Sequence, residues 1–196
     1  PPPQLREYQI ECKDGIREAV QIEGSSLLVM PTGAGKTRTT MRGIREFIET
    51  SEPPIHVLWI VHSDELCEQA EHAFESVWTN NRDIVHHPNL WLNIVYGSGM
   101  TPRAELYNDG KPSFTIATPD SIDYWGEEAP CEFDLIVVDE AHHGIEEQIN
   151  RVFDKLPHKH RLGLTATPEL TSNRQLFATS YRNLIYPREY LGDANQ

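Results

Sequence analysis

The sequence predicts a doubly wound α/β domain, in which a mostly parallel β-sheet is covered by helices on both faces. Short, continuous apolar runs alternate along the chain with segments whose apolar residues recur at helical spacing. This alternation is typical of a parallel sheet, because each crossover between parallel strands places a helix on one face or the other. A glycine-rich turn follows the first apolar run and precedes a helical pattern. At 196 residues the chain fits one domain, and we expect a single domain over residues 1–196.

The amino-terminal part of the chain alternates between helix and strand patterns. Apolar side chains fall at helical spacing over residues 5–20, and the apolar run 27–30 follows as the first strand. Helical spacing returns over residues 36–49, until two prolines end it ahead of a second strand at 55–61. Ser63 is expected to cap the next helix, because its hydroxyl can accept a backbone N–H and acidic residues follow in the favourable first turn.

The rest of the chain supplies four more predicted strands. After a polar loop, an apolar run at 92–96 ends in a glycine-containing turn, and a short, poorly defined segment separates it from a strand at 114–117. The run 135–138 is the clearest strand of all, because its four residues are leucine, isoleucine and valine. Helical spacing over 145–156 leads to a sixth strand at 162–164, and the remaining carboxyl-terminal part has weak periodicity.

The glycine-rich turn is a candidate phosphate-binding loop. It joins the first strand to the next helix and reads Pro31-Thr32-Gly33-Ala34-Gly35-Lys36-Thr37. Backbone N–H groups in such a turn, together with the positive end of the helix, point at one position where an anion can sit. Lys36 would then reach the β- and γ-phosphates of a nucleotide, and the Thr37 hydroxyl would hold Mg²⁺. Met30 stands where the usual pattern has its first glycine, so an incidental glycine-rich turn is the alternative interpretation.

Polar residues follow directly after several predicted strands, where ligands bind in parallel sheets. Asp139 and Glu140 come immediately after the strand 135–138. Asp139 suits the support of a Mg²⁺ ion, and Glu140 suits the activation of a water molecule, so the pair indicates hydrolysis of a γ-phosphoryl group. The alternative is that both carboxylates only begin the next helix, where the helix dipole favours them.

Composition limits the partners that the chain can have. A hydrophobic share of 38% without any long apolar run indicates a soluble protein with no membrane span, and no secretory signal pattern opens the chain, so we expect a cytoplasmic location. Three widely spaced cysteines suit reduced, buried thiols. The net charge of −13 argues against gripping nucleic acid by bulk electrostatics, so any contact with a polyanion must be local.

Four motifs, in the same order as in a known family, resemble those of the first RecA-like motor domain of superfamily 2 helicases and translocases. The phosphate-binding loop resembles motif I, and the others are the adenine-reading Q motif in Leu5-Arg6-Glu7-Tyr8-Gln9, motif II of the DEAH type in Asp139-Glu140-Ala141-His142, and motif III in Leu164-Thr165-Ala166-Thr167-Pro168. The resemblance implies a three-layer RecA-like P-loop NTPase domain that uses ATP and Mg²⁺. Lys36, Asp139 and Glu140 would be catalytic. Arg6 and Gln9 would read adenine. Coupling of the nucleotide state to a second RecA-like domain would fall to His142, Thr165 and Thr167.

Two further segments resemble the family's nucleic-acid-facing motifs Ia and Ib, at residues 61–66 and 117–121. The resemblance implies contacts with the nucleic-acid backbone from Ser63, Gly97 and Thr118. A helix cap or a turn is the alternative role of these residues. The chain departs from the family's pattern at Asp64, which would repel a phosphate.

The expected function is that of the first motor domain of a nucleic-acid-dependent ATPase, either a helicase or a translocase. Its motifs resemble restriction-enzyme motor subunits most, which favours DNA over RNA. The second motor domain has no counterpart in this chain, so the fragment is expected to be monomeric and to hydrolyse ATP slowly or not at all, because an arginine from that domain can be worth about 10³- to 10⁵-fold in rate. A nucleotide-dependent regulatory or RNA-sensing module that does not translocate is the alternative. A P-loop kinase is disfavoured, because transfer to a bound acceptor does not need the acid pair or the Thr-Ala-Thr segment.

Overall fold

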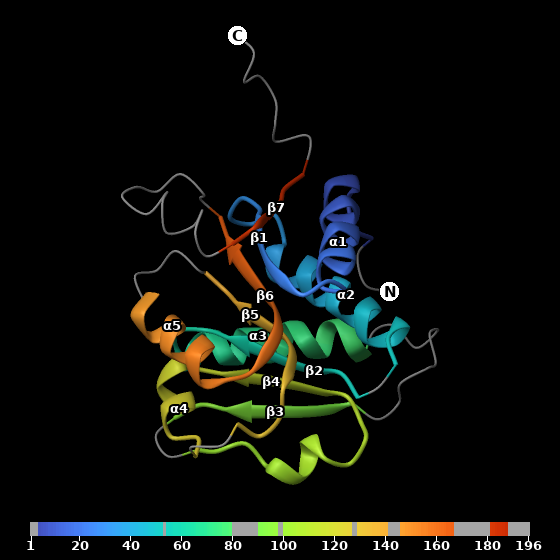
Figure 1. Cartoon of the computed structure of the whole chain (residues 1–196). Coiled ribbons are helices and arrows are strands. Elements are labelled where there is room, and N and C mark those ends of the chain that lie inside the picture. The colour runs from blue at the N-terminus through green and yellow to red at the C-terminus, as the bar shows by residue number, and fades with distance from the viewer. Residues whose placement is uncertain are drawn as a thin grey trace.

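A single parallel sheet forms the centre of the molecule (Figure 1). The computed structural model describes residues 4–52, 54–79, 90–97, 100–126, 129–140, 146–166 and 181–187. Its seven strands lie in the order β3-β4-β2-β5-β6-β1-β7, and all the described pairings are parallel. The strands are β1 (Gly24–Val29), β2 (His56–Ile60), β3 (Trp91–Val95), β4 (Ser113–Ala117), β5 (Phe133–Val138), β6 (His158–Thr165) and β7 (Asn183–Ile185).

Helices cover both faces of this sheet, which makes three layers (Figure 1). The helical elements are α1 (Glu7–Ala19), α2 (Lys36–Thr50), α3 (Asp64–Thr79), the 3₁₀ turn η1 (Ala104–Tyr107), α4 (Pro119–Asp123) and α5 (Glu146–Lys155). Successive side chains of a strand point to opposite faces, so Val57 and Trp59 of β2 join the core under α1, α2 and α3. Leu58 and Ile60 join a second core under α4 and α5. The predicted doubly wound α/β architecture is confirmed.

Three short elements of the structure were not predicted from the sequence. β7 has only three residues and is half exposed, so its apolar pattern is too short to detect. η1 and α4 are single turns with five residues or fewer, and they lie in or next to the segments interpreted as irregular. Within the described ranges, no helix is long and apolar enough to cross a membrane.

The order of the strands determines which loops meet. β6 pairs with β1 on one side and with β5 on the other. The turn after β1, the end of β5 and the end of β6 are therefore neighbours at the carboxyl edge of the sheet, although β1 and β5 are far apart in the sequence. This edge carries the candidate nucleotide site.

Candidate nucleotide and nucleic-acid sites

The turn between β1 and α2 has the backbone of a phosphate-binding loop. Gly33 and Gly35 have φ angles of 78° and 82°, in the left-handed region that glycine adopts without a steric penalty. α2 begins directly after Gly35, and the first N–H groups of a helix have no partner within the helix. The N–H of Met30 donates to the Thr165 carbonyl at 3.0 Å, which ties the start of the loop to the end of β6. The loop is therefore fixed at the carboxyl edge of the sheet, where its N–H groups can bind an anion.

The start of α1 holds this loop from the other side. The Ala34 carbonyl accepts hydrogen bonds from the Gln9 side-chain amide at 2.8 Å and from the Tyr8 hydroxyl at 3.2 Å. The oxygen of the same Gln9 side-chain amide accepts a hydrogen bond from the backbone N–H of Arg6 at 2.9 Å. A methyl group on Gly35 would come within 2.6 Å of the Gln9 amide nitrogen, so any larger residue there would displace the Gln9 side chain from the loop, in addition to straining the φ angle of 82°.

This arrangement adds a positioning role to the residues of the Q-like segment. Gln9 uses both ends of its amide inside the protein, and the reading of adenine by Arg6 and Gln9 stays a prediction. Tyr8 was expected as an apolar residue of the helix and as part of the Q-like segment, with no contact of its own. Its place beside Gln9 in the Arg-x-Tyr-Gln motif is the signal that could have identified its contact with the loop.

Side chains of the phosphate loop and of the end of β5 meet at the carboxyl edge. The Lys36 amine lies 2.6 Å from a carboxylate oxygen of Glu140, and the Thr37 hydroxyl donates to the Asp139 carboxylate at 3.2 Å. The two residues of each pair lie more than a hundred positions apart in the sequence. In the sheet, only β6 lies between β1 and β5, the strands that precede them. The two strongest candidates from separate parts of the sequence therefore form one cluster.

The backbone at Glu140 is strained. Its φ angle of 55° is the single positive value among the described non-glycine residues. A residue with a Cβ atom in this region costs about 1–2 kcal/mol, and such strain concentrates at functional sites. The N–H of Glu140 donates to the Asp139 carboxylate at 3.0 Å. This turn directs the two acidic side chains to different partners, Asp139 to Thr37 and Glu140 to Lys36.

Burial changes the pKa of one member of this cluster, Asp139. Lys36 has 8% of its side chain exposed, against 30% for Glu140. Burial raises the pKa of Asp139 from 3.8 to about 6, even though Lys36 and the Thr37 hydroxyl act in the opposite direction. Asp139 is therefore ionised at neutral pH at a cost that a bound cation would relieve.

Asp139 makes the stability of the metal-free domain depend on pH. Because its pKa is raised in the folded state, the cost of ionising it is present above pH 6 and disappears as the pH falls from 6 towards 3.8. Asp139→Asn carries no charge, so it is expected to raise the free energy of unfolding by about 3 kcal/mol near neutral pH and to change it little at about pH 4.

Urea denaturation of both proteins without divalent cations measures this difference. In saturating Mg²⁺ and ATP the difference should shrink, because only the wild-type carboxylate helps to hold the nucleotide-bound cation. If Asp139→Asn raised the free energy of unfolding equally near neutral pH and at about pH 4, the cost would not arise from ionisation of Asp139.

The oxygens of Thr37 and Asp139 suit Mg²⁺. Mg²⁺ prefers oxygen ligands and is commonly bound by one or two protein groups together with phosphates and water. The described part of the chain contains no group of three or more metal-binding side chains, so the protein offers two oxygens and leaves the other positions to a nucleotide and water. The residues present therefore fit a nucleotide-bound Mg²⁺ ion better than a resident metal.

The predicted coupling residues are described only in part. Thr165 ends β6, is fully buried, and accepts the Met30 N–H with its carbonyl. It therefore contacts the phosphate loop through the backbone. His142 and Thr167 lie outside the described residues.

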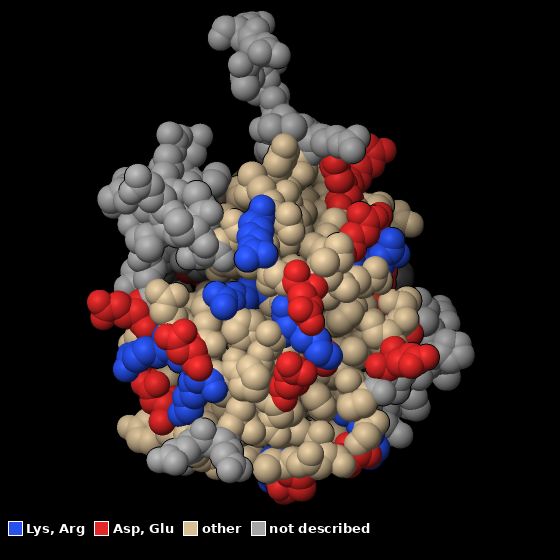
Figure 2. All heavy atoms as spheres, viewed as in Figure 1, with Lys and Arg blue, Asp and Glu red and all other residues tan. Residues whose placement is uncertain are grey.

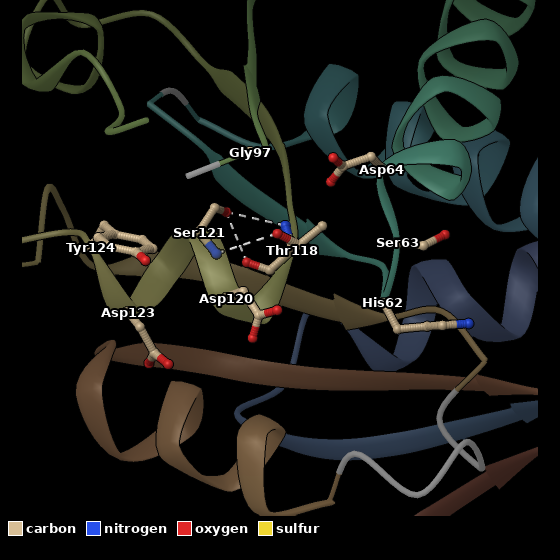
Figure 3. A pocket seen from close by; sticks show the side chains of 9 residues that line it. All are labelled: His62, Ser63, Asp64, Gly97, Thr118, Asp120, Ser121, Asp123 and Tyr124. Carbon is tan, nitrogen blue, oxygen red and sulfur yellow. Dashed lines mark hydrogen bonds between the residues drawn. The ribbon is translucent and has the colours of Figure 1, made fainter. Parts of the chain in front are cut away.

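The three predicted nucleic-acid contacts line one pocket at the other half of the carboxyl edge. Ser63 precedes α3, Gly97 follows β3, and Thr118 follows β4, and all three border a pocket of about 410 Å³ (Figure 3). The Ser63 hydroxyl accepts the Leu66 N–H at 3.3 Å, and the Thr118 hydroxyl accepts the Ser121 N–H at 3.3 Å. The helix-cap role is thus confirmed for both hydroxyls, and their contact with nucleic acid stays a prediction.

The charged side chains that line this pocket are acidic. Asp64, Asp120 and Asp123 line it, and its described lining contains no lysine or arginine. On the face shown in Figure 2, basic side chains lie among acidic ones and form no continuous basic surface. The structure agrees with the expectation, from the net charge of −13, that any polyanion contact is local.

The fold and the site together define a class of protein. A parallel sheet with a phosphate loop after β1 and an Asp-Glu pair after β5 is typical of a RecA-like P-loop NTPase domain. Superfamily 2 helicases and translocases have such a domain as the first of their two motor domains. Residues 2–170 match the family described as "Type III restriction enzyme, res subunit". The chain belongs to this family, and it is a helicase- or translocase-like motor domain.

Three known proteins that resemble this chain are much longer than the chain itself. It is 29% identical to a DNA 3'-5' translocase, XPB2, from Sulfurisphaera tokodaii, over 82% of the chain and 32% of the relative. It is 28% identical to the type I restriction enzyme EcoAI endonuclease subunit of Escherichia coli, over 90% of the chain and 20% of the relative. The solved structure of the type ISP restriction-modification enzyme LlaGI shares the fold, with a TM-score of 0.72 and 20% identity over 94% of the chain and 20% of that protein. The chain thus spans a third or less of these proteins.

Proposed function

We propose that this chain is the ATP-binding first motor domain of a DNA-dependent helicase or translocase. The observation that carries the proposal is the cluster at the carboxyl edge, where Lys36 and Thr37 of the phosphate loop meet Glu140 and Asp139 of β5. This cluster combines a cation for phosphate oxygens, two oxygens for Mg²⁺ and a carboxylate for a proton. These are the parts that hydrolysis of a γ-phosphoryl group requires.

Each side chain of the cluster has a separate role in the proposed reaction. Lys36 exchanges Glu140 for phosphate oxygens when a nucleotide binds, because the phosphates carry more negative charge than one carboxylate and compete for the same ammonium donors. Glu140 is then free to orient a water molecule and to accept its proton. Thr37 and Asp139 would hold Mg²⁺, which when bound neutralises charge on the β- and γ-phosphate oxygens.

The polymer is inferred from the relatives, and the partner domain from the resemblance to superfamily 2 motors. One relative is named as a DNA translocase, and the LlaGI structure was solved with a DNA substrate mimic, which supports DNA over RNA. We infer that a second RecA-like domain of the full-length protein supplies an arginine to the phosphates. Such an arginine raises the rate by about 10³- to 10⁵-fold in related NTPases, so this chain alone should turn over ATP slowly.

ATP turnover by the full-length protein tests the proposal. Duplex DNA is expected to stimulate the rate more than RNA of the same length, and displacement of a third strand from a triplex should accompany turnover. Turnover that no polymer changes would contradict the motor function and would favour the regulatory module. Stimulation without triplex displacement would keep the ATPase assignment and exclude translocation on duplex DNA.

A further inference from the structure

Three side chains on one face of α5 hold α4. Gln148, Arg151 and Lys155 follow one another at intervals of three and four residues, which places them on the same side of the helix. The Gln148 amide donates to Asp120 at 3.3 Å, and Arg151 lies 3.6 Å from Asp123. In Figure 3 the side chains of Asp120 and Asp123 point from α4 towards the faint orange helix, which is α5. The polar face of α5 is therefore turned to α4.

Lys155 makes the closest of these contacts. Its ammonium group has three N–H donors, and they reach the main-chain carbonyls of Trp125 at 2.7 Å, Ile122 at 2.8 Å and Asp123 at 3.3 Å. The last carbonyls of a helix have no partners inside it and carry partial negative charge. Because α4 has only five residues, it has little stability of its own. The position of α4 therefore depends on Lys155.

An apolar core also fixes the two helices to each other. Ile122 and Trp125, at the end of α4, are buried in the same cluster as Ile149 and Val152 of α5. The two helices lie side by side in Figure 1. Close-packed side chains transmit a displacement because they leave no free volume to absorb it. A shift of α4 therefore moves α5 with it.

The two ends of this unit lie next to the two candidate sites. α4 begins directly after Thr118, which is predicted to contact nucleic acid. α5 begins at Glu146, six positions after Glu140 in the sequence. The turn at Glu140 has a strained φ angle of 55°, and Lys36 holds its carboxylate at 2.6 Å. Nucleotide binding is proposed to replace that contact, so Glu140 has two arrangements, and a displacement of α5 can favour one of them.

We propose that Lys155 is a positioning residue that couples DNA binding beside α4 to the arrangement of the turn at Glu140. The inference rests on the proposed function, because it assumes a motor domain that binds both DNA and ATP. DNA that binds beside Thr118 displaces α4, Lys155 passes the displacement to α5, and the turn at Glu140 changes its arrangement. Nucleotide binding acts in the reverse direction through the same contact, because coupling between two binding sites is reciprocal.

Binding of duplex DNA and of a non-hydrolysable ATP analogue to the full-length protein tests the proposal. The coupling factor is the ratio of the DNA dissociation constants measured without the analogue and with the analogue at saturation, and the reverse titration must give the same factor. Lys155→Met keeps the stem of the side chain and removes the ammonium group. It is expected to bring the factor closer to 1 by about 2- to 30-fold, while the affinity for each ligand alone stays unchanged.

Two further variants separate coupling from damage to the fold. Lys155→Arg keeps a charged donor and should restore most of the coupling factor. Gln148→Ala combined with Arg151→Ala leaves Lys155 in place and changes the more exposed contacts, since Arg151 has 60% of its side chain exposed. This double variant should move the factor towards 1 by about 2-fold, because exposed contacts contribute little. It tests the contact between the helices even if Lys155→Met unfolds.

Lys111→Met is the matched control, because it removes the same charge from another half-buried lysine. Lys111 precedes β4, whereas α4 follows the other end of that strand, so the coupling factor should not change. If Lys155→Met weakens DNA binding equally with and without the analogue, Lys155 only anchors α4 and the inference is wrong. A wild-type factor of 1 would also overturn it, although the proposed function would stand. If the wild type binds no DNA, both fail.

Discussion

Replacing Glu140 with glutamine in the full-length protein is expected to lower kcat for ATP hydrolysis by about 10²- to 10⁴-fold, the usual contribution of a positioned general base. Glutamine has nearly the same shape but cannot accept the proton of an attacking water molecule. Nucleotide binding should be retained and should tighten, because the amide competes less than the carboxylate for the Lys36 amine, which lies 2.6 Å away in the nucleotide-free domain.

Single-turnover kinetics and nucleotide titration measure these two effects separately. Glu46→Gln is a matched control, because Glu46 also receives a lysine amine, that of Lys13, at 2.6 Å and is similarly exposed, at 35%. Glu46 is on α2 and pairs with Lys13 of α1, so Glu46→Gln should leave kcat unchanged. A Glu140→Gln protein that keeps more than half of the wild-type kcat would remove Glu140 from the proposed reaction.

Replacing Lys36 with methionine is expected to weaken ATP binding by about 10- to 100-fold, because a hydrogen bond from a charged donor is worth about 1.5–3 kcal/mol. The effect should depend on the phosphates. ATP and ADP should lose more affinity than AMP, since Lys36 begins the helix that follows the phosphate loop and is predicted to reach the β- and γ-phosphates. Methionine keeps the length and most of the volume of the buried side chain, which limits damage to the fold.

Isothermal titration with the three nucleotides measures this pattern. Lys13→Met is the matched control, because Lys13 is also largely buried, at 14% exposed, and paired with a glutamate. That variant should bind all three nucleotides normally. An equal loss of ATP and AMP affinity in Lys36→Met would mean that the variant disturbs the whole site and that Lys36 does not contact the outer phosphates.

Local patterns were sufficient for most of the fold. The strand that became β5 could be read from an unbroken apolar run, because a strand buried on both faces has no polar side to interrupt it. The phosphate loop could be read because Gly33 and Gly35 must adopt left-handed φ angles next to a lysine at a helix start. α4 and β7 could not, since elements of five and three residues are too short to show a period.

The roles of individual polar side chains depended on contacts distant in the sequence. Gln9 was predicted to read adenine, and the structure shows its amide bonded to the carbonyl of Ala34. Ser63 and Thr118 are the local exception, because their hydroxyls cap helices through N–H groups three residues away, as the sequence predicted for Ser63, and their contact with nucleic acid stays a prediction. A hydrogen-bonding residue has several possible partners, and only the packing of the chain selects among them.

The sequence by itself determined the phosphate loop, the acid pair and the alternation of strands and helices, because each depends on residues within one turn or one strand. The tertiary structure decided that these parts form one site. β6 lies between β1 and β5, and this order brings Lys36 to Glu140 and Thr37 to Asp139. Strand order depends on how crossovers pack their helices against both faces of the sheet, a property of the whole domain that no single segment carries.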